Sequence, residues 1–334
     1  MHRNIFLFFS AIVLFSACQK SSKYIYNEGL IHGTIYHIIY ESPQGVDFQE
    51  DIKKRMHAFD QSLSTFEPNS VISRINRNDP DVVVDDDFRT VFLKAEEISQ
   101  KTGGAFDITV APLVNAWGFG FKHKESVTGP LIDSLLLTVG HQKVKLVGSR
   151  IVKENPGTML DASAIAKGYS VDVIAGLLAD KGCENYIVEI GGEVVARGVS
   201  SKNQIWKIGI NKPIDDPENQ NNELEVVIRL KDRGLATSGN YRNFYLENGK
   251  KYAHTIEPSS GYPVQHNVLS ASVLAKNCMT ADAYATAFMV MGLEKAREIV
   301  EKDPDLEALI IYAEDDSGQN KIWYSKEFEK LFVK

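Results

Sequence analysis

The chain has 334 residues, of which 43% are hydrophobic and 24% charged, proportions that exclude a disordered chain and a polytopic membrane protein. Its formal net charge of −7 argues against a general nucleic-acid binder, because the phosphate backbone attracts a basic surface. Three cysteines are too few for a disulfide scaffold in a chain of this length.

The N-terminal segment is typical of a signal peptide. Arg3 precedes an apolar run over residues 5–15, which is too short to span a bilayer as a helix but matches the core of a signal peptide. Small residues then lead to Cys18, an order that resembles a bacterial lipoprotein signal, in which the cysteine carries the lipid. The alternative is an ordinary secretory signal with an incidental cysteine. In both cases the mature protein is expected to work outside the cytoplasm.

These features divide the chain into three parts. We expect residues 1–17 to be a lipoprotein signal peptide, residues 18–29 a tether, and residues 30–334 the functional domain. A lipid on Cys18 would anchor the protein to a bacterial membrane, with the periplasmic face expected. The sequence leaves open whether Cys183 and Cys278 pair, and two buried free thiols are expected.

Strand and helix signals follow one another along the chain without a regular alternation. Helices are predicted where apolar residues recur at helical spacing, at residues 47–59, 86–101, 131–139, 163–181 and 281–301, with a break expected at Gly292. Strands are predicted at residues 30–40, 144–147, 186–190, 206–210, 224–230, 251–256, 269–274 and 306–312. A doubly wound parallel sheet needs strict alternation, so the pattern predicts an α+β fold with a mixed, partly antiparallel sheet and packed helices.

The familiar short motifs of phosphate, zinc and dinucleotide binding are absent. There is no GxxxxGK[ST] loop, no HExxH and no CxxC, and Gly191-Gly192 lacks the third glycine of a dinucleotide fingerprint. The chain instead contains dense clusters of glycine, small residues and isolated polar groups. They lie at residues 102–107, 161–168, 236–242, 254–258 and 280–286.

The cluster at residues 280–286 predicts a site for a hard cation. Asp282 and Thr286 are four residues apart in a predicted helix, so their side chains share one face. Oxygen donors without soft ligands suit Mg²⁺, which also binds phosphate oxygens. The alternative is that Thr280 caps the helix and Asp282 only complements its dipole.

The cluster at residues 161–168 opens another predicted helix. A helix N-terminus carries free amides and a partial positive charge, which favour a phosphate group, and Lys167 adds a full charge nearby. Ala164 is small enough to expose its backbone carbonyl. The alternative is that Asp161 or Ser163 caps the helix and that Lys167 is solvated.

Two further polar residues carry open interpretations. Asp107 follows a Gly-Gly pair and would accept hydrogen bonds from the edge of a ring, unless it is only a turn carboxylate. His254 lies in a strand-like stretch and suits a general base, although a lone histidine is more often structural.

Taken together and in this order, the clusters resemble the FAD:protein FMN transferase family, also called ApbE. The resemblance rests on several segments: Gly33-Thr34-Ile35-Tyr36, Ser64-Thr65-Phe66 with Ser70, Ser73 and Asn76, TGGAFDITVAPLVNAWGFG at 102–120, residues 161–168, GGEVVARG at 191–198, residues 235–242, HTIEPSSGYPV at 254–264 and residues 278–292. It covers essentially the whole chain from about residue 30 onward. Several motifs in register are more specific than any one of them alone.

This resemblance implies a single catalytic unit with an ApbE-like, T-fold-like architecture that holds FAD and Mg²⁺. The family moves the FMN half of FAD onto a threonine or serine hydroxyl of an acceptor flavoprotein, which forms a phosphoester and releases AMP. The expected partners are therefore FAD and redox flavoproteins that carry a flavinylation motif outside the cytoplasm, with no role for nucleic acid.

Carried over by position, the resemblance also implies site residues. The FAD pocket would draw on His32, Phe66, Ala105, Phe106, Asp107, Asp161, Lys167, Thr255 and Ile256. The metal would be held by Ala164, Asp282, Ala285 and Thr286, and His254 would deprotonate the acceptor hydroxyl.

Two departures from the family pattern leave other activities open. Asp161-Ala162-Ser163 replaces the commoner Asp-Leu-Gly, and Ser238-Gly239-Asn240 stands where many members have Ser-Gly-Asp. One alternative is an Mg²⁺-dependent FAD pyrophosphatase that gives FMN and AMP. The other is a lipoprotein that binds FAD without chemistry, but a pure binding protein needs no base.

Overall fold

The structure of the protein is a computed structural model. The structure describes residues 23–120, 127–214, 223–240, 244–247, 250–314 and 320–333. The expected signal peptide and Cys18 lie outside the described residues. Among the described residues, no helix has the length and apolar character needed to cross a membrane.

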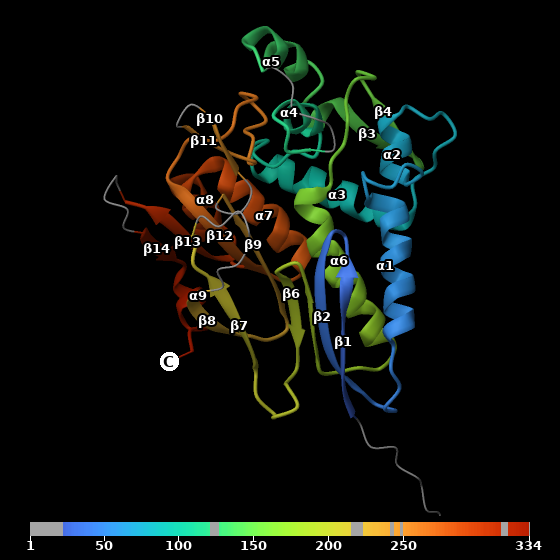
Figure 1. Cartoon of the computed structure of the whole chain (residues 1–334), viewed down its shortest axis with the longest axis vertical. Helices are drawn as coiled ribbons and strands as arrows, with labels where there is room; N and C mark the ends of the chain where they lie inside the picture. Colours follow the sequence, from blue (N-terminus) through green and yellow to red (C-terminus); the bar gives the residue numbers. More distant parts are fainter. Residues whose placement is uncertain are drawn as a thin grey trace, which may run out of the picture.

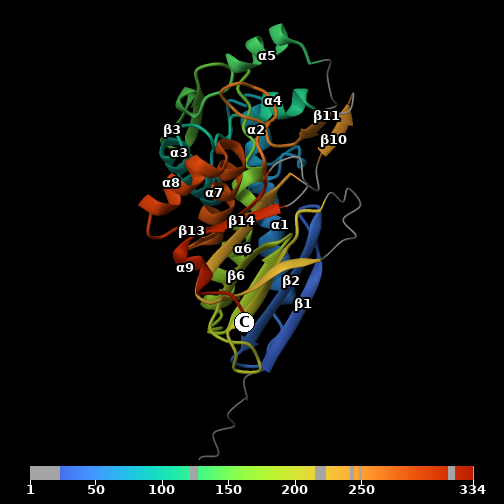
Figure 2. The same cartoon turned by 90° about the vertical axis from the view of Figure 1, so that its left-hand side faces the viewer.

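An eight-stranded sheet forms the centre of the fold (Figures 1 and 2). Its spatial order is β1 (Lys23–Ile31), β2 (Thr34–Ser42), β5 (Tyr186–Ile190), β6 (Glu193–Arg197), β9 (Arg233–Gly239), β12 (Val268–Ala275), β13 (Glu307–Ala313) and β14 (Asn320–Tyr324). Each strand runs antiparallel to its neighbours in this sheet. The α+β class is confirmed, and this sheet is antiparallel throughout rather than mixed.

Helices cover one face of this sheet in two layers. The inner layer is α6 (Ser163–Asp180), which packs on β5 and β6, and α7 (Cys278–Met291), which packs on β9 and β12. The outer layer contains α1 (Gln49–Leu63), α3 (Asp86–Lys101) and the short α2 (Val71–Asn76), while α8 (Leu293–Lys302) packs beside β13. The main hydrophobic core lies between the sheet and these helices.

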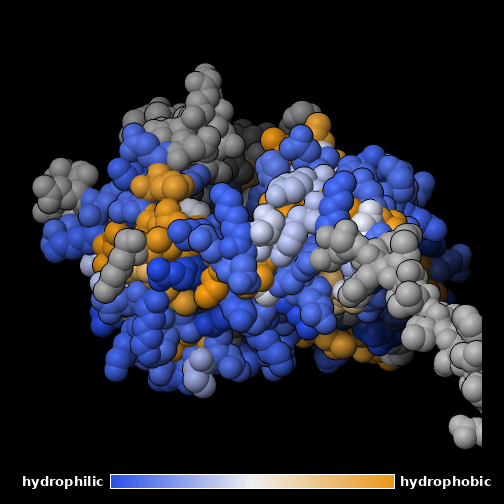
Figure 3. Space-filling view, turned by 90° about the horizontal axis from the view of Figure 1, so that it is seen from below, coloured by the Kyte–Doolittle hydropathy of each residue, from blue (hydrophilic) through white to orange (hydrophobic). Residues whose placement is uncertain are grey.

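The opposite face of the sheet is covered by a smaller layer. The hairpin of β7 (Trp206–Asn211) and β8 (Leu224–Leu230) and the short α9 (Lys326–Glu329) bury a second apolar cluster there. Figure 3 views the molecule from below, where hydrophilic residues predominate and apolar patches lie between them.

A third cluster lies above the sheet in Figure 1, around α4 (Ala111–Ala116) and α5 (Gly129–Leu136). The indole Nε1 of Trp117 donates to the Gly261 carbonyl at 2.9 Å, which ties the loop after residue 254 to α4. Two small hairpins complete the fold: β3 (Val144–Val147) with β4 (Arg150–Lys153), and β10 (Phe244–Glu247) with β11 (Lys250–Ala253).

The start of the chain differs most from the prediction. The single strand expected at residues 30–40 is a hairpin, because His32 and Gly33 both adopt positive φ, 51° and 73°, and reverse the chain. Strand β1 begins at Lys23, so residues 23–29 belong to the sheet and not to the expected tether. The folded body therefore starts seven residues earlier than the predicted boundary at residue 30.

Several other predictions agree with the structure. The helix expected at residues 281–301 is divided at Gly292, whose φ of 80° ends α7 and precedes α8. Cys183 and Cys278 are buried and free, as expected. Strands β6 and β9 were not predicted: β6 is short and has two adjacent valines instead of alternation, and glycine and small residues weaken the alternating pattern in β9.

Candidate active site

One cavity of about 490 Å³ collects most of the predicted site residues. Its walls come from the loop before α4, the start of α6, the strands β6 and β9, the segment after β11, and α7. The predicted residues that line it are Ala105, Phe106, Asp107, Asp161, Ala164, Lys167, His254, Thr255, Ile256, Asp282 and Thr286. Segments that are far apart in the sequence therefore meet at one place, as the resemblance implied.

The N-terminus of α6 lies at this cavity. Its N-cap residue, Ala162, offers no side-chain acceptor, and Ser163, Ala164 and Lys167 all line the cavity. Asp161 Oδ1 accepts the amide of Ser163 at 2.8 Å, and burial raises the pKa of Asp161. A helix end of this kind binds an anionic group through its remaining amides and its dipole.

Three charged side chains lie close together beside this helix end. The ammonium of Lys167 pairs with Glu193, which is only 2% exposed. Burial, and secondarily the nearby Asp282, raise the pKa of Glu193 to about 7, although Lys167 acts in the opposite direction. Burial also raises the pKa of Asp282, again against the effect of Lys167. Two buried carboxylates therefore share one ammonium, which leaves negative charge uncompensated.

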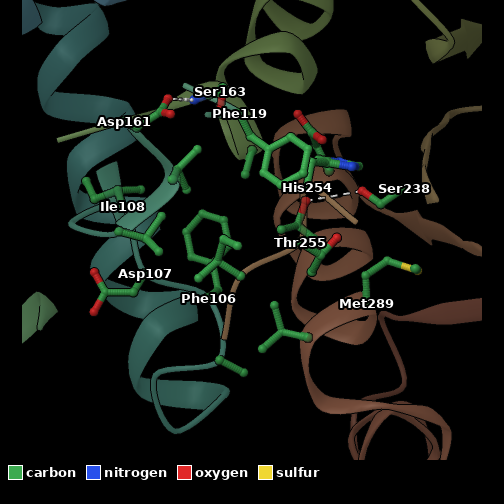
Figure 4. A pocket seen from close by; sticks show the side chains of 18 of the residues that line it. Phe106, Asp107, Ile108, Phe119, Asp161, Ser163, Ser238, His254, Thr255 and Met289 are labelled. Atoms are coloured by element: carbon green, nitrogen blue, oxygen red, sulfur yellow. Dashed lines mark hydrogen bonds between the residues drawn. The ribbon is translucent and has the colours of Figure 1, made fainter. Parts of the chain in front are cut away.

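Asp282 and Thr286 point into the cavity from α7. Asp282 is 3% exposed, and its Oδ2 accepts the amide of Gly168 from α6 at 2.9 Å. The Thr286 hydroxyl lies 3.1 Å from the hydroxyl of Ser238 on β9 (Figure 4). The alternative role for this segment is wrong: α7 begins at Cys278 with Asn277 as its cap, and Asp282 bonds to a neighbouring helix rather than to its own N-terminus.

The loop at residues 105–108 forms the opposite wall. Figure 4 shows the Phe106 ring toward the centre of the lining residues and the Asp107 carboxylate pointing away. Asp107 Oδ1 accepts the amide and hydroxyl of Thr109 at 2.8 and 2.6 Å, and Oδ2 accepts the amide of His141 at 2.7 Å. The carboxylate thus holds the loop in shape, which matches the alternative of a turn carboxylate.

His254 lies at the cavity on the side of α4 and β9. Its ring packs edge-on against Phe119, with the ring centres 6.4 Å apart. The neighbouring Thr255 donates its hydroxyl to Asn240 Oδ1 at 2.7 Å, and both of these residues are buried. Asn240 is thus the departure from the family pattern that lies beside the predicted base.

Three predicted residues do not line the cavity. His32 lies at the turn between β1 and β2, where its ring packs on Phe59 and its Nδ1 is 2.7 Å from Asp60 Oδ1. Phe66 lies between α1 and α2 and is 80% exposed. Ala285 is fully buried on the face of α7 that packs in the core. Their predicted roles in binding remain predictions.

The structure also adds residues that sequence reasoning did not assign. Thr237, Ser238 and Gly239 line the cavity because β9 ends there, and Glu193 lines it because β6 starts there. Residues 236–242 had been noted as a cluster of glycine and small residues and residues 191–198 as a motif of the family resemblance, but the strands in these segments were not predicted. No cluster of three or more His, Cys, Asp or Glu side chains suited to a metal occurs in the described part of the chain.

The fold is an α+β fold, with an antiparallel sheet under two helix layers. Its partly enclosed cavity combines a helix N-terminus, a lysine, a buried carboxylate and a histidine. These groups suit a phosphorylated ligand. Comparison with known proteins makes this class specific. Residues 32–310 match the model of the ApbE family, and the chain belongs to that family.

Relatives and solved structures agree with this assignment. The chain is 36% identical over 331 residues to the FAD:protein FMN transferase of Haemophilus influenzae, covering 95% of this chain and 94% of that protein. It is 34% identical over 322 residues to the one of Vibrio cholerae, covering 94% and 95%. The solved flavin transferase ApbE of Vibrio cholerae superposes with a TM-score of 0.83, covering 93% of this chain and all of that chain. The apo flavinyl transferase of Pseudomonas stutzeri gives 0.81 at 28% identity, covering 93% and 97%.

Proposed function

We propose that the protein transfers the FMN half of FAD to a threonine or serine hydroxyl of an acceptor flavoprotein, with Mg²⁺ as its cofactor. The new bond joins the acceptor oxygen to the phosphorus of FMN, and the bond between the two phosphates breaks to release AMP. The relatives named as FAD:protein FMN transferases support this activity. The observation that carries it is the meeting of His254, Lys167 and Asp282 around one cavity.

The oxygen donors on α6 and α7 fit Mg²⁺. Asp282 is buried and has one oxygen bonded to Gly168, while no donor from the described residues bonds its other oxygen. In a regular helix the Gly168 amide bonds the Ala164 carbonyl, so the bond to Asp282 competes with that helical bond for the same amide. Asp282, Thr286 and the Ala164 carbonyl would then hold the ion, with Ala285 beside them.

Charge also favours a cation here. Asp282 and Glu193 outnumber Lys167, and a carboxylate buried without compensation is costly. When bound, Mg²⁺ would neutralise charge on the pyrophosphate as the leaving group departs.

The chain's own residues would perform the remaining tasks. Lys167 and the first amides of α6 would bind phosphate oxygens and stabilise the charge that develops on them. Phe106 would pack against a ring of FAD. His254 would take the proton of the attacking hydroxyl, which ionises by itself only at strongly alkaline pH.

Hydrolysis of FAD to FMN and AMP is the second candidate, because water can replace the acceptor hydroxyl in the same site. Asn240 keeps this candidate open, since it bonds to Thr255 beside His254 and replaces the commoner aspartate. Storage of FAD without chemistry is the third candidate, and the presence of a base in the cavity argues against it.

We further propose that the protein acts outside the cytoplasm, held to a bacterial membrane by a lipid on Cys18. The order of residues at 1–18 supports this. The acceptors would then be redox flavoproteins exposed on the same side of the membrane.

The three candidate activities give different products. With FAD, Mg²⁺ and an acceptor protein that carries a flavinylation motif, we expect the acceptor mass to increase by one FMN and AMP to appear in equal amount. Mass spectrometry of the acceptor and chromatography of the nucleotides measure both. Free FMN without a change in the acceptor would indicate hydrolysis, and intact FAD would indicate storage.

The proposed metal ligands predict two graded defects. Asp282→Ala removes a charged oxygen donor and should abolish transfer at ordinary Mg²⁺, whereas Thr286→Ala removes a neutral oxygen and should raise the Mg²⁺ concentration needed for half-maximal rate. Thr280→Ala is the matched control, because Thr280 lies on the same helix outside the cavity lining. An unchanged Mg²⁺ dependence in Asp282→Ala would contradict this metal site.

The role of His254 predicts a rate defect with retained binding. His254→Asn should bind FAD nearly as wild type does but slow transfer by about 10²–10⁴-fold, because general-base assistance is lost. Equal losses of FAD affinity and turnover would make His254 a binding residue. The control is His37→Asn, because His37 is exposed and lies away from the cavity.

The lipid anchor predicts a change of location without loss of activity. Cys18→Ser should release the protein from membranes and leave it active, because residue 18 lies outside every motif on which the family resemblance rests. Fractionation after a high-salt wash measures the release. Retention of Cys18→Ser in the membrane at the wild-type level would show that lipidation at Cys18 is not the anchor.

A further inference from the structure

The first turn of α7 receives its acceptors from another helix. Asp172 on α6 accepts the amide of Cys278 on Oδ1 at 2.9 Å and the amide of Met279 on Oδ2 at 2.8 Å. These are the first two amides of α7, which has no acidic residue of its own in its first turn. The side chain of its cap residue, Asn277, accepts the amide of Thr280, and the Asn277 carbonyl accepts the amide of Ala281. Both oxygens of Asp172 therefore serve α7, and Asp172 itself does not line the cavity.

A second hydrogen bond joins the same two helices about one turn away, and here the amide belongs to α6 and the carboxylate to α7. Gly168 precedes Asp172 by four residues on α6, and Asp282 follows Cys278 by four residues on α7. Gly168 donates its amide to Asp282, so each helix gives a carboxylate to the other's backbone. Two such contacts, about 6 Å apart along the helices, fix the register in which α6 and α7 pack.

Backbone contact makes this register sensitive. A Cβ at Gly168 would lie 2.4 Å from the Cys278 carbonyl oxygen and 2.7 Å from Cβ of Asp282. On the other side, a Cβ at Gly234 of β9 would lie 2.3 Å from the Cys278 amide nitrogen. The first turn of α7 is therefore enclosed between α6 and β9, and its two bonds to Asp172 tie its backbone directly to α6.

We propose that Asp172 is a positioning residue for the metal ligands: by binding the first two amides of α7, it aligns Asp282 and Thr286 with the Ala164 carbonyl on α6. This inference rests on the proposed function, because it assumes that these groups share one cation. The carboxylate is needed for its two acceptor oxygens. The side chain of asparagine offers only one acceptor oxygen. Its NH₂ group would face an N–H of α7, and two donors cannot form a hydrogen bond.

The test compares two aspartates whose carboxylates each accept amides at the N-terminus of a helix. Asp172→Asn should weaken the binding of Mn²⁺, measured by electron paramagnetic resonance in the presence of ADP, by about 10–100-fold, as the loss of other outer residues of metal sites does. Asp85→Asn is the matched control: Asp85 caps α3 through the Phe88 amide at 2.8 Å, and α3 contributes no residue to the cavity lining. This control should bind Mn²⁺ as wild type does.

Two outcomes separate the failure of this inference from the failure of the proposed function. If wild type and Asp282→Ala bind Mn²⁺ and ADP equally, the metal site itself is wrong. If wild type binds more tightly than Asp282→Ala, and a folded Asp172→Asn binds as wild type does, only the role of Asp172 is wrong.

A measurement on the wild type keeps the inference testable even if Asp172→Asn does not fold. Binding of Mn²⁺ and ADP should slow hydrogen exchange of the amides of Cys278 and Met279, because the ion and Asp172 stabilise the same placement of α7. Unchanged exchange at these two amides, with exchange slowed elsewhere around the cavity, would overturn it.

Discussion

The contact between α6 and α7 determines how Lys167, Asp282 and Thr286 lie relative to one another. Both helices pack on the sheet, and they approach so closely at Gly168 that no side chain fits between them. One helix then places its N-terminus and Lys167 at the cavity, and the other places Asp282 and Thr286 there. Alanine at residue 168 would separate the helices and move the two halves of the site apart. The glycine thus contributes to chemistry without touching the ligand.

This close packing places an excess of carboxyl groups in a buried part of the cavity. Asp282 and Glu193 are both buried, while Lys167 supplies a single positive charge and the pKa values of both carboxyl groups are raised by burial. Burying these groups in charged form costs free energy, which protonation relieves in part. A cation at the proposed site would relieve the rest of that cost and would therefore also stabilise the folded protein.

Local signals in the sequence determined how much could be predicted. The helix at residues 86–101 was predicted with its observed bounds, and the break at Gly292 was correct, because both depend on neighbours within a few turns. Asp172 and Glu193 could not be found in this way, since their partners lie 106 and 26 residues away and become neighbours only when α6 meets α7 and β6. The strand β9 was missed for a related reason: its small residues are selected by the close approach of α7, not by strand propensity.

The same cavity also explains why transfer and hydrolysis are neighbouring outcomes. The groups proposed to bind the phosphates, Lys167 and Asp282, act on FAD alone and do not distinguish water from a protein hydroxyl. Discrimination must then come from the side of His254, where the acceptor would enter and where Phe119 and the bond between Asn240 and Thr255 shape the wall. An amide at residue 240 accepts this bond without adding another carboxylate beside a cavity that several carboxylates already line. Asn240, one of the two departures from the family pattern, therefore lies on the side where the acceptor, rather than FAD, would be recognised.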